Sequence, residues 1–384
     1  MLSRLRQVSA KLQTAENEAV TLTAADANIL AYSPKMAIET EMTERNPVTN
    51  AHGRIGPLPG KTPASFGFSI EMSGSGTPTT EPGWSKLLKA CGVDFNNVYS
   101  ISIGAVSDGP FQHGETIEGG TSGALGRVVI NTANGATAMY FVPVGSGDFQ
   151  SGEVITGETS GATVTTSSTP SAVGKVIQLA SEPDPEDVAL LTMGSYEGGV
   201  RKLMSSARGT AKFKLESGKP AMIELAFNGV YAGIDDLTLP ALATPPENPP
   251  TFLSASFSIG SYAAILKTTE IDLGVKLAPR DDVNRSAGIM SYQIVDRDVK
   301  GSFDPEMALV AAHDFFSLWH AGTEAVLDFT LGTVTGHKFR FYAPRAQYIK
   351  VDDGDRDGIA VAETQFSLNK SLTFGNDEIC ILCL

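Results

Sequence analysis

Alternate aspartates near the end of the chain are the residues whose spacing comes closest to a known chemistry. In the segment DGDRDG, Asp353, Asp355 and Asp357 occupy the first, third and fifth positions of a calcium-binding loop, and a glycine follows at the sixth. The twelfth position, where such a loop needs a glutamate, holds Thr364. The residues that follow alternate between apolar and polar types, which predicts a strand where the loop requires a helix. The three aspartates are candidate metal ligands, but a hairpin turn fits the pattern better.

The segment GPLPGKT (residues 56–62) resembles a phosphate-binding loop only in part. That loop has four residues between its first glycine and the Gly-Lys pair, and three are present here. Pro57 and Pro59 also lack the backbone N–H groups that would have to bind phosphate. We therefore expect a turn here.

Cysteine and histidine residues do not form a recognisable site. Cys380 and Cys383 lie in the apolar segment EICILCL, and side chains three apart on a strand point to opposite faces. His313 and His320 could share one face of a helix, but no third ligand lies at a plausible spacing. There is also no Ser/His/Asp set. We predict no catalytic residue, cofactor-binding residue or cofactor, and an enzyme is not expected.

The composition indicates a large, acidic protein with enough apolar residues for real cores. The chain has 384 residues, 42% of them hydrophobic, and a net charge of −14. This length suggests two or three domains. The negative charge makes nonspecific DNA binding unfavourable, which suits a protein that DNA must pass without being held. The few cysteines fit a reducing compartment. Because neither a signal peptide nor a membrane-spanning stretch is apparent, we expect a soluble protein with no membrane partner.

Period-two alternation dominates the sequence and predicts a mainly β fold. It is seen in ASFGFSIEM from Ala64, in AKFKLES from Ala211 and in HKFRFYA from His337. Helical signal is confined to GWSKLLKACG and to residues 304–322. We expect β-sandwich or barrel-like domains with one short helix each.

Comparison of the chain with itself indicates a duplication. Shifting it by 235 positions places the segment from Leu30 on that from Ile265, and Phe68 on Phe303. Before the first helix the offset falls to 231, and after that helix it falls to 138, so the first copy contains an insertion. The expected organisation is an N-terminal arm (1–29), a first domain (30–102 and 177–238), an inserted β module (103–176), a proline-rich linker (239–252) and a second domain (253–384).

The insertion has a repeat of its own. FQHGETIEGGTSGA from Phe111 recurs as FQSGEVITGETSGA from Phe149, an offset of 38. Each copy predicts a strand, a turn and a return rich in small residues. We interpret the insertion as a small β module carried by a surface loop, where insertions cost least.

Several phrases resemble the tail tube (major tail) proteins of tailed bacteriophages. They are SGSGTPTTEPGWSKLLKACG, with Trp84, Leu87, Leu88, Cys91 and Gly92; RKLMSSARGTAKFKLESGKPAMIELAFNGVYA from Arg201; and YAAILKTTEIDLGVKL, YQIVDRDVKGSF and GDRDGIAVAETQFSL in the second half. The resemblance covers about 280 residues, nearly everything outside the insertion. It implies two tandem tube domains and a virion protein of a long, non-contractile tail, made in the cytoplasm of the bacterial host.

The resemblance also implies partners. The protein would assemble with itself as stacked rings, in which three chains supply six domains around a channel for DNA ejection. Tape measure, tail terminator and tail-tip proteins would be further partners, and DNA would pass the lumen without specific binding. The alternative interpretation is a decoration or tail-tip protein whose β insertion binds a host surface.

Two sets of residues are the candidates for these roles. We expect a mobile loop (residues 73–83), pinned by an anchor helix, to order only on contact with the next ring or domain. We also expect a basic arm to link rings and to be removable without unfolding the subunit. The candidates for contacts between subunits are Arg4, Arg6, Lys11, Ser75, Thr79, Trp84, Leu87 and Leu88. The candidates for a net negative lumen are Glu39, Glu41, Glu44, Asp272, Glu306 and Asp328.

Overall fold

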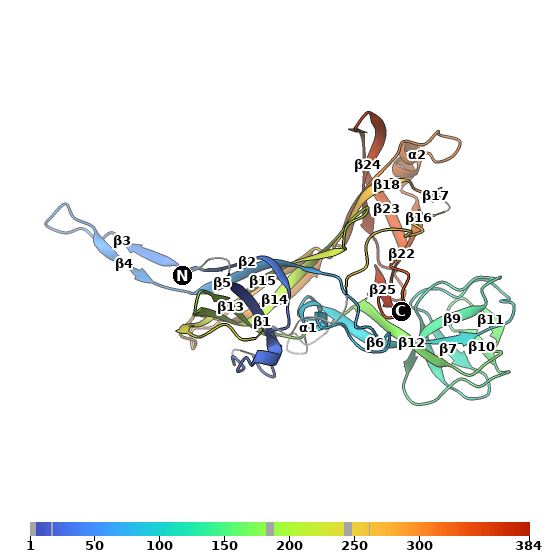
Figure 1. The fold of residues 1–384 in the computed structure, drawn as a ribbon, viewed down its shortest axis with the longest axis horizontal. Coiled ribbons are helices and arrows are strands. Elements are labelled where there is room, and N and C mark those ends of the chain that lie inside the picture. The colour runs from blue at the N-terminus through green and yellow to red at the C-terminus, as the bar shows by residue number, and fades with distance from the viewer. Residues whose placement is uncertain (1–4, 17, 182–187, 242–247, 261) are drawn as a thin grey trace.

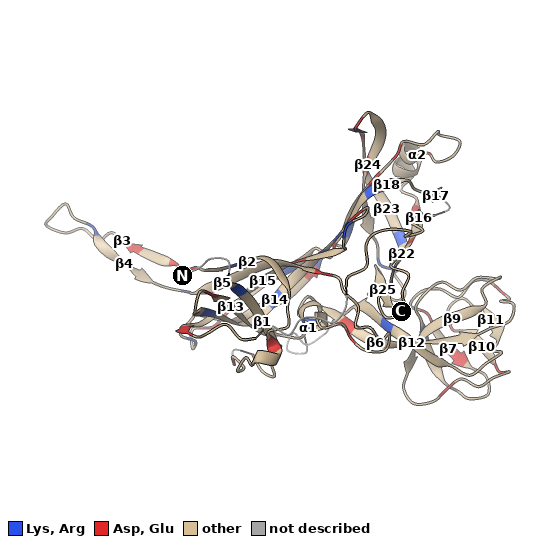
Figure 2. Cartoon of the chain, in the orientation of Figure 1, with Lys and Arg blue, Asp and Glu red and all other residues tan. Residues whose placement is uncertain are grey.

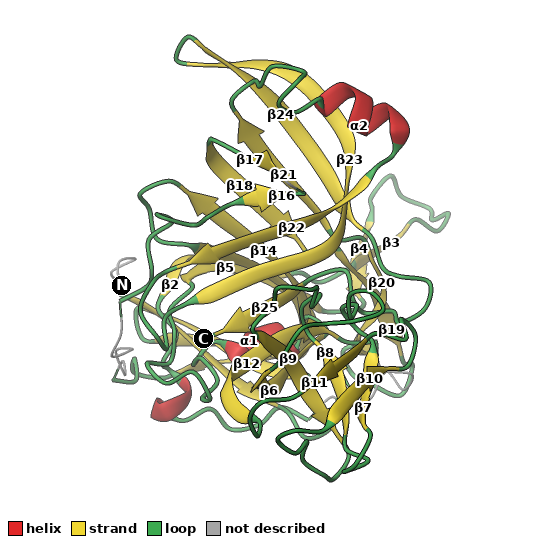
Figure 3. Ribbon diagram, turned by 90° about the vertical axis from the view of Figure 1, so that its right-hand side faces the viewer, coloured by secondary structure: helices red, strands yellow, loops and turns green. Residues whose placement is uncertain are grey.

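A computed structural model describes residues 5–16, 18–181, 188–241, 248–260 and 262–384 (Figure 1). The protein is mainly β, with 54% strand and 4% helix. One antiparallel sheet network joins 21 strands, and two further sheets are two-stranded hairpins. Figure 3 shows how little helix there is: the strands themselves form the layers, and side chains between them form the core.

Six strands build the first unit. Paired in the order β1-β13-β14-β15-β5-β2, they are β1 (Arg6–Leu12), β13 (Leu191–Glu197), β14 (Val200–Glu216), β15 (Met222–Asp236), β5 (Pro63–Glu71) and β2 (Ala31–Ile38). The first half of β14 pairs with β13 and its second half continues beyond that strand. β14 therefore belongs to two sheets that fold over one another, and apolar side chains fill the space between them.

The second unit repeats this order with different residues. Paired in the order β16-β22-β23-β24-β21-β18, its strands are β16 (Ser258–Ile259), β22 (Glu324–Leu331), β23 (Phe339–Arg356), β24 (Ile359–Leu368), β21 (Lys300–Pro305) and β18 (Leu266–Asp272). A short strand, β17 (Tyr262–Ala263), pairs with β16. The pairing register shifts between Tyr32 and Lys35 in β2, and between Leu266 and Thr269 in β18. The two irregularities are 234 residues apart, one residue less than the offset between the two copies, so they occupy equivalent places in the two units.

Each unit also carries a two-stranded hairpin. β3 (Met42–Arg45) pairs with β4 (Ile55–Pro59), and β19 (Val275–Asp281) pairs with β20 (Ile289–Arg297). Thr43 lies opposite Leu58, and Ala278 lies opposite Gln293, so these pairs are 235 residues apart. The hairpin β19–β20 lies against the first unit, whereas β3–β4 projects away from the rest of the chain at the left of Figure 1.

The helices are short and support the core. In α1 (Ser85–Lys89), Leu87 and Leu88 are buried. The second, α2 (Phe315–Ala321), begins after Asp314, whose side chain accepts a hydrogen bond from the backbone N–H of Ser317. It ends at Gly322, which has φ 63°. A short 3-10 turn, η1, spans Ala24–Asp26.

The predicted helical segment 304–322 was too long. β21 continues to Pro305, and the carboxylate of Asp304 accepts hydrogen bonds from the backbone N–H groups of Lys267 and Thr268. Asp304 therefore completes the irregular pairing of β18 and does not cap a helix.

The insertion has its own hydrophobic core and forms a separate lobe at the lower right of Figure 1. Its strands are β7 (Thr116–Gly119), β8 (Leu125–Val128), β9 (Ala138–Val144), β10 (Val154–Gly157) and β11 (Thr163–Thr165). It is carried by β6 (Val93–Ser102) and β12 (Ser171–Leu179), which pair with each other. β12 also pairs with the last strand, β25 (Cys380–Cys383). Residues 171–176 thus belong to a strand of the main body, so the expected end of the insertion at 176 lies six residues too late.

Two buried glutamates explain the internal repeat of the insertion. Glu115 accepts hydrogen bonds from the backbone N–H groups of Thr159 and Ser160, at 2.9 and 2.5 Å. Glu153 does the same for Thr121 and Ser122, at 3.3 and 3.0 Å. Each glutamate therefore closes the Thr-Ser-Gly turn of the other repeat. A Cβ on Gly119 would lie 2.7 Å from the Glu153 carboxylate, so glycine is required where the two repeats meet.

The N-terminal segment is not a separate arm. β1 pairs with β13 along its full length, and Val8 and Ala10 are completely buried. The guanidinium of Arg6 lies 2.7 Å from Glu197, and Lys11 donates a hydrogen bond to the carbonyl of Thr21. Since this strand completes one sheet of the first unit, its removal is now expected to disturb the fold, contrary to the expectation for a free arm. Arg4 lies outside the described residues.

Candidate functional site: a polar sheet face with two free edges

One continuous sheet runs through both units. Its strands follow in the order β2-β5-β15-β14-β18-β21-β24-β23. The join between the units is the pairing of β14 with β18, in which Lys212 lies opposite Asp272 and Lys214 opposite Glu270. This sheet is therefore built from strands of both copies.

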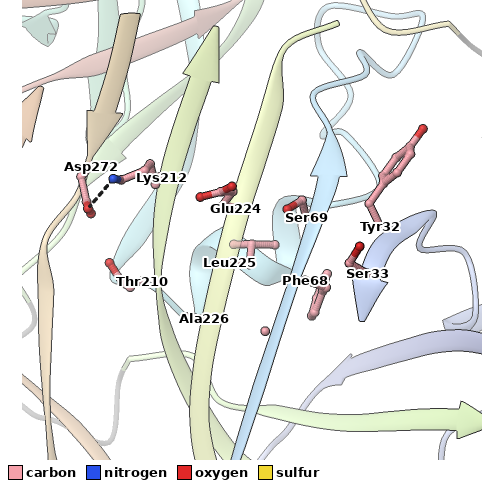
Figure 4. A pocket seen from close by; sticks show the side chains of 11 residues that line it. Tyr32, Ser33, Phe68, Ser69, Thr210, Lys212, Glu224, Leu225, Ala226 and Asp272 are labelled. Carbon is pink, nitrogen blue, oxygen red and sulfur yellow. Dashed lines mark ion pairs between the residues drawn. The ribbon is translucent and has the colours of Figure 1, made fainter. Parts of the chain in front are cut away.

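The two faces of this sheet differ because neighbouring residues on a strand point to opposite sides. Phe213, Ile223 and Ile271 are buried in the core on one side. Lys212, Glu224 and Asp272 lie on the other side and are partly exposed. Figure 4 shows these polar side chains along an open groove of about 350 Å³ that crosses from β2 to β18.

The charges on the polar face are paired across strands. The ammonium of Lys212 lies 3.3 Å from the carboxylate of Glu270 and 3.7 Å from that of Asp272. Lys214 lies 2.8 Å from Glu224, and the hydrogen bond with this carboxylate raises the pKa of the lysine. Because cations and anions satisfy one another, the groove presents neither an isolated nucleophile nor an isolated acid–base pair.

The two ends of the eight-stranded sheet have edges without a partner strand. β2 pairs with β5 on one side, and its other edge pairs with no strand of the described part of the chain. At the opposite end, β22 covers β23 only as far as Gln347, and β24 occupies the other side. The edge of β23 from Lys350 to Arg356 is likewise unpaired among residues whose structure is described. Such edges are ready to pair with another chain.

The lumen candidates are distributed over three surfaces. Asp272 lies on the polar sheet face, and Glu306, beside the end of β21, lies 2.9 Å from the guanidinium of Arg356. Asp328 belongs to β22, outside the eight strands, and pairs with Arg340 at 2.6 Å. Alternation alone could not show that β22 lies outside the eight-stranded sheet, and a position of Asp328 in a lumen stays a prediction.

Three further lumen candidates are exposed. Glu44 lies in β3 of the projecting hairpin, and Glu39 and Glu41 lie in the segment that leads from β2 to it. Figure 2 shows both acidic and basic residues on that hairpin.

Most candidates for contacts between subunits are engaged within the chain. Trp84 is 5% exposed, and its indole Nε1 donates a hydrogen bond to the carbonyl of Ser73 at 2.8 Å. Its ring also packs against Phe95 and Phe339. Trp84, Leu87 and Leu88 are therefore core residues that cannot reach another chain, and their assignment to a subunit contact was wrong.

The glycine-rich loop preceding α1 is ordered by the second unit of the same chain. The N–H of Gly76 donates to the carbonyl of Gly336, and a Cβ on Gly74 would lie 1.9 Å from that carbonyl oxygen. The hydroxyl of Ser75 donates to the carbonyls of Thr77 and Thr80. Thr79 lies exposed on the same loop. Glycine is needed here for the close approach of two backbones, which the sequence alone did not indicate.

The candidate metal ligands form a hairpin turn. β23 and β24 are joined by Asp357 and Gly358, both with positive φ, as expected for a tight two-residue turn. Asp355 accepts a hydrogen bond from the N–H of Gly358 at 3.1 Å. In the described ranges, no group of three His, Cys, Asp or Glu side chains could hold a metal ion. Burial raises the pKa of the Cys380 and Cys383 thiols, which suits packing and not reactivity.

Sequence reasoning missed a buried cation where the second hairpin meets the first unit. The Arg208 side chain is fully buried and donates to the carbonyls of Tyr292 and Val188, both at 2.8 Å. Burial lowers the pKa of Arg208 to about 10, although the carboxylate of Glu16 lies 4.0 Å away. β14 carries several other charged residues, so the sequence did not single out Arg208, and its partners Tyr292 and Val188 come from other segments.

Comparison with protein-family models found no match for this chain. A search of curated proteins found no match either. Among the helices of the described residues, none is long and apolar enough to cross a membrane.

Proposed function

We propose that this chain is the tail tube protein of a long-tailed, non-contractile bacteriophage. It would be a structural virion protein that polymerises as stacked rings around a channel for DNA ejection. The observation that carries the proposal is the eight-stranded sheet with a different free edge at each end. Two unlike edges favour head-to-tail association, which forms a ring when the rotation closes. A closed ring leaves neither end of the eight-stranded sheet with an exposed edge.

The duplication supports a ring of three chains. Each chain contains two units with the same strand order, joined by one strand pairing. Three such chains would supply six units, and the repeated join would give approximate sixfold symmetry. The polar face of the eight-stranded sheet would then line the channel, because the other face is buried in the core.

The charge of this face suits a channel that DNA traverses. Its central lysines, Lys212 and Lys214, are paired with carboxylates, so they are not free cations that would hold phosphates. The whole chain has a net charge of −14. A net negative lumen stays a prediction, and a calculated potential that is positive along the channel of an assembled ring would contradict it.

The resemblance to phage tail tube proteins supplies the remaining parts of the proposal. Tape measure, tail terminator and tail-tip proteins are the proposed partners besides other copies of the chain. The protein would be made in the bacterial cytoplasm and reside in the virion tail.

Electron microscopy and sedimentation of the purified protein test this function. Rings or tubes with a central channel are expected, and tube length should grow with protein concentration. A protein that stays monomeric at all concentrations, and after addition of a tail-tip complex as a starter, would contradict the proposal.

A decoration or tail-tip protein that binds a host surface is the second candidate. The observation that favours it is the insertion, which has its own core and lies apart from the polar sheet face. Under this alternative, monomeric protein would bind bacterial cells, and binding would be lost when residues 103–170 are replaced by a short linker.

A further inference from the structure

The join between the two units has a specific register and a specific charge pattern. β14 residues Lys212–Glu216 pair antiparallel with β18 residues Thr268–Asp272. On the polar face, the lysines lie on β14 and the acids lie on β18, within ion-pair distance of one another. The join therefore has a basic strand and an acidic strand.

The equivalent positions in the other copies are the two free edges. The 235-residue offset equates Thr268–Asp272 of β18 with Ser33–Ala37 of β2. For the other strand of the join, the register of the neighbouring strand pairs gives the equivalence. Lys212 of β14 lies opposite Glu224 of β15, and Asp352 of β23 lies opposite Glu363 of β24. Because these glutamates are equivalent, residues 212–216 of β14 correspond to 352–356 of β23. Each free edge thus matches one strand of the join that the chain already contains.

One charge of the join is reversed on each free edge, while Ala37 and Gly354 stand where Asp272 and Lys214 lie in the join. Lys35 in β2 replaces the acid Glu270 of β18, and Asp352 in β23 replaces the lysine Lys212 of β14. Asp353 and Asp355 are exposed at the same end of β23 but point to the other face, and Asp352 is itself ion-paired with Lys350 of its own strand. Lys35 is exposed and has no ion-pair partner among the described residues.

We propose that copies of this chain join through a charge-reversed version of the internal join. The free edge of β2 in one copy pairs antiparallel with residues 352–356 of β23 in another, with Ala37 opposite Asp352. Lys35 then lies diagonally across from Asp352, within reach of a cross-strand ion pair. Pro34 has no N–H, so the hydrogen-bonded ladder is densest from Lys35 onward. This inference rests on the proposed ring and identifies the contact that closes it.

Charge reversal makes the two kinds of join non-interchangeable. If β2 paired with β14, Lys35 would lie opposite Lys214. If β18 paired with β23, Asp272 would lie opposite Asp352. Like charges directly opposite each other destabilise a strand pair, so each edge rejects the wrong partner. The result is a ring in which internal and external joins alternate.

The projecting hairpin belongs to the same contact. Within the chain, β19–β20 lies against the first unit: the N–H of Thr62 donates to the carbonyl of Ala287, and Lys61 lies 2.6 Å from Asp281. Its equivalent, β3–β4, has Met42 54%, Ile55 40% and Leu58 49% exposed. If β3–β4 is placed on the neighbouring copy as β19–β20 is placed on the first unit, it lies against the second unit of that copy. This contact covers the three apolar side chains.

Disulfide trapping in the full chain tests the register. Ala37→Cys combined with Asp352→Cys should give covalent multimers that end at three chains under oxidising conditions. The chain's own cysteines, Cys91, Cys380 and Cys383, are buried and give no background. The control, Ala31→Cys with Asp352→Cys, moves the thiol about 20 Å along the strand and should remain uncrosslinked.

Charge exchange tests the pairing itself. Lys35→Glu should weaken association about tenfold at low salt, since an attraction becomes a repulsion. Adding Asp352→Lys should restore it, because the pair then has the charges of the internal join. Arg127→Glu, on an exposed position of the insertion, makes the same change in net charge and should leave association unaltered.

The outcomes separate this inference from the proposed function. Rings that form without crosslinking at Ala37 and Asp352, or without rescue by the second charge change, would overturn the register and leave the ring proposal standing. Monomers from the unaltered protein would overturn the ring. Thermal unfolding of each variant identifies any that fails to fold, and the crosslinking pair then decides.

Discussion

The buried glutamates of the insertion give the sharpest test of how the chain's own residues hold its fold. Glu153 is 5% exposed and accepts hydrogen bonds from three backbone N–H groups, those of Thr121, Ser122 and Gln150, and from the hydroxyl of Ser122. Glu153→Ala removes the acceptor and leaves those donors inside the module. Each unsatisfied buried group costs about 1–3 kcal/mol, and water that enters the site would satisfy some of the donors. We therefore expect the free energy of unfolding of the module to fall by about 3–5 kcal/mol.

Amide hydrogen exchange on the full chain measures this loss locally. Glu153→Ala should speed exchange throughout residues 111–166 while the strands of the two units keep their protection. Glu153→Gln keeps one carbonyl oxygen and should cost less. Glu158→Ala removes an exposed carboxylate from the same repeat and is the matched control. If the amides of residues 111–166 exchanged at the same rates in the Glu153→Ala and Glu158→Ala variants, the conclusion that each buried glutamate closes the turn of the other repeat would be refuted.

Acid should weaken the same module. Burial alone would raise the pKa of Glu153, but the hydrogen bonds from Gln150, Ser122 and Thr121 outweigh it and hold the pKa below its usual value. A carboxyl whose pKa is lower in the folded state stabilises fully above its unfolded pKa, about 4.3, and loses that contribution as the pH falls through the folded pKa. Since the intrinsic rate of amide exchange itself falls with pH, the quantity to measure is protection relative to an unfolded peptide at the same pH. This protection should decrease in the insertion in the acidic range, and Glu153→Gln should flatten the dependence.

Three further predictions concern the main body. Trp84→Ala should lower the free energy of unfolding by about 3–5 kcal/mol in urea titration, whereas Leu309→Ala, at a position 82% exposed, should have little effect. Removal of Met1–Gln13 should give insoluble or unfolded protein, because it deletes β1 from its sheet; a soluble, cooperatively unfolding product would contradict this. Replacement of residues 103–170 by a short Gly/Ser linker should leave folded subunits that still form rings, since Ser171 already lies opposite Ser100; loss of rings in electron micrographs would give the insertion a structural role.

Much of the architecture followed from local patterns in the sequence. Alternation in β5 and β24 gave strands with the correct buried face, as at Phe66, Phe68 and Phe366. Helix α1 followed from its apolar spacing, and the turn at Asp357 and Gly358 from its residue types. These features depend on neighbours in the chain, which a sequence displays directly.

Features that depend on distant segments could not be predicted. The sequence predicted Val8 and Ala10 to be part of a loose arm, because the strand with which they pair begins only at Leu191, far away in the chain. Trp84 looked like a contact residue, because Phe339, which covers it, is far away in sequence. The join of β14 with β18 likewise brings together residues about sixty positions apart, and no local pattern specifies which strand fills an edge.

A reconstruction of the assembled ring by electron cryomicroscopy tests the central claim most directly. Three chains around a channel are expected, with six equivalent units and with β2 of each chain paired to β23 of the next. Six chains in one ring, or a ring in which β2 and β23 remain unpaired, would contradict the account.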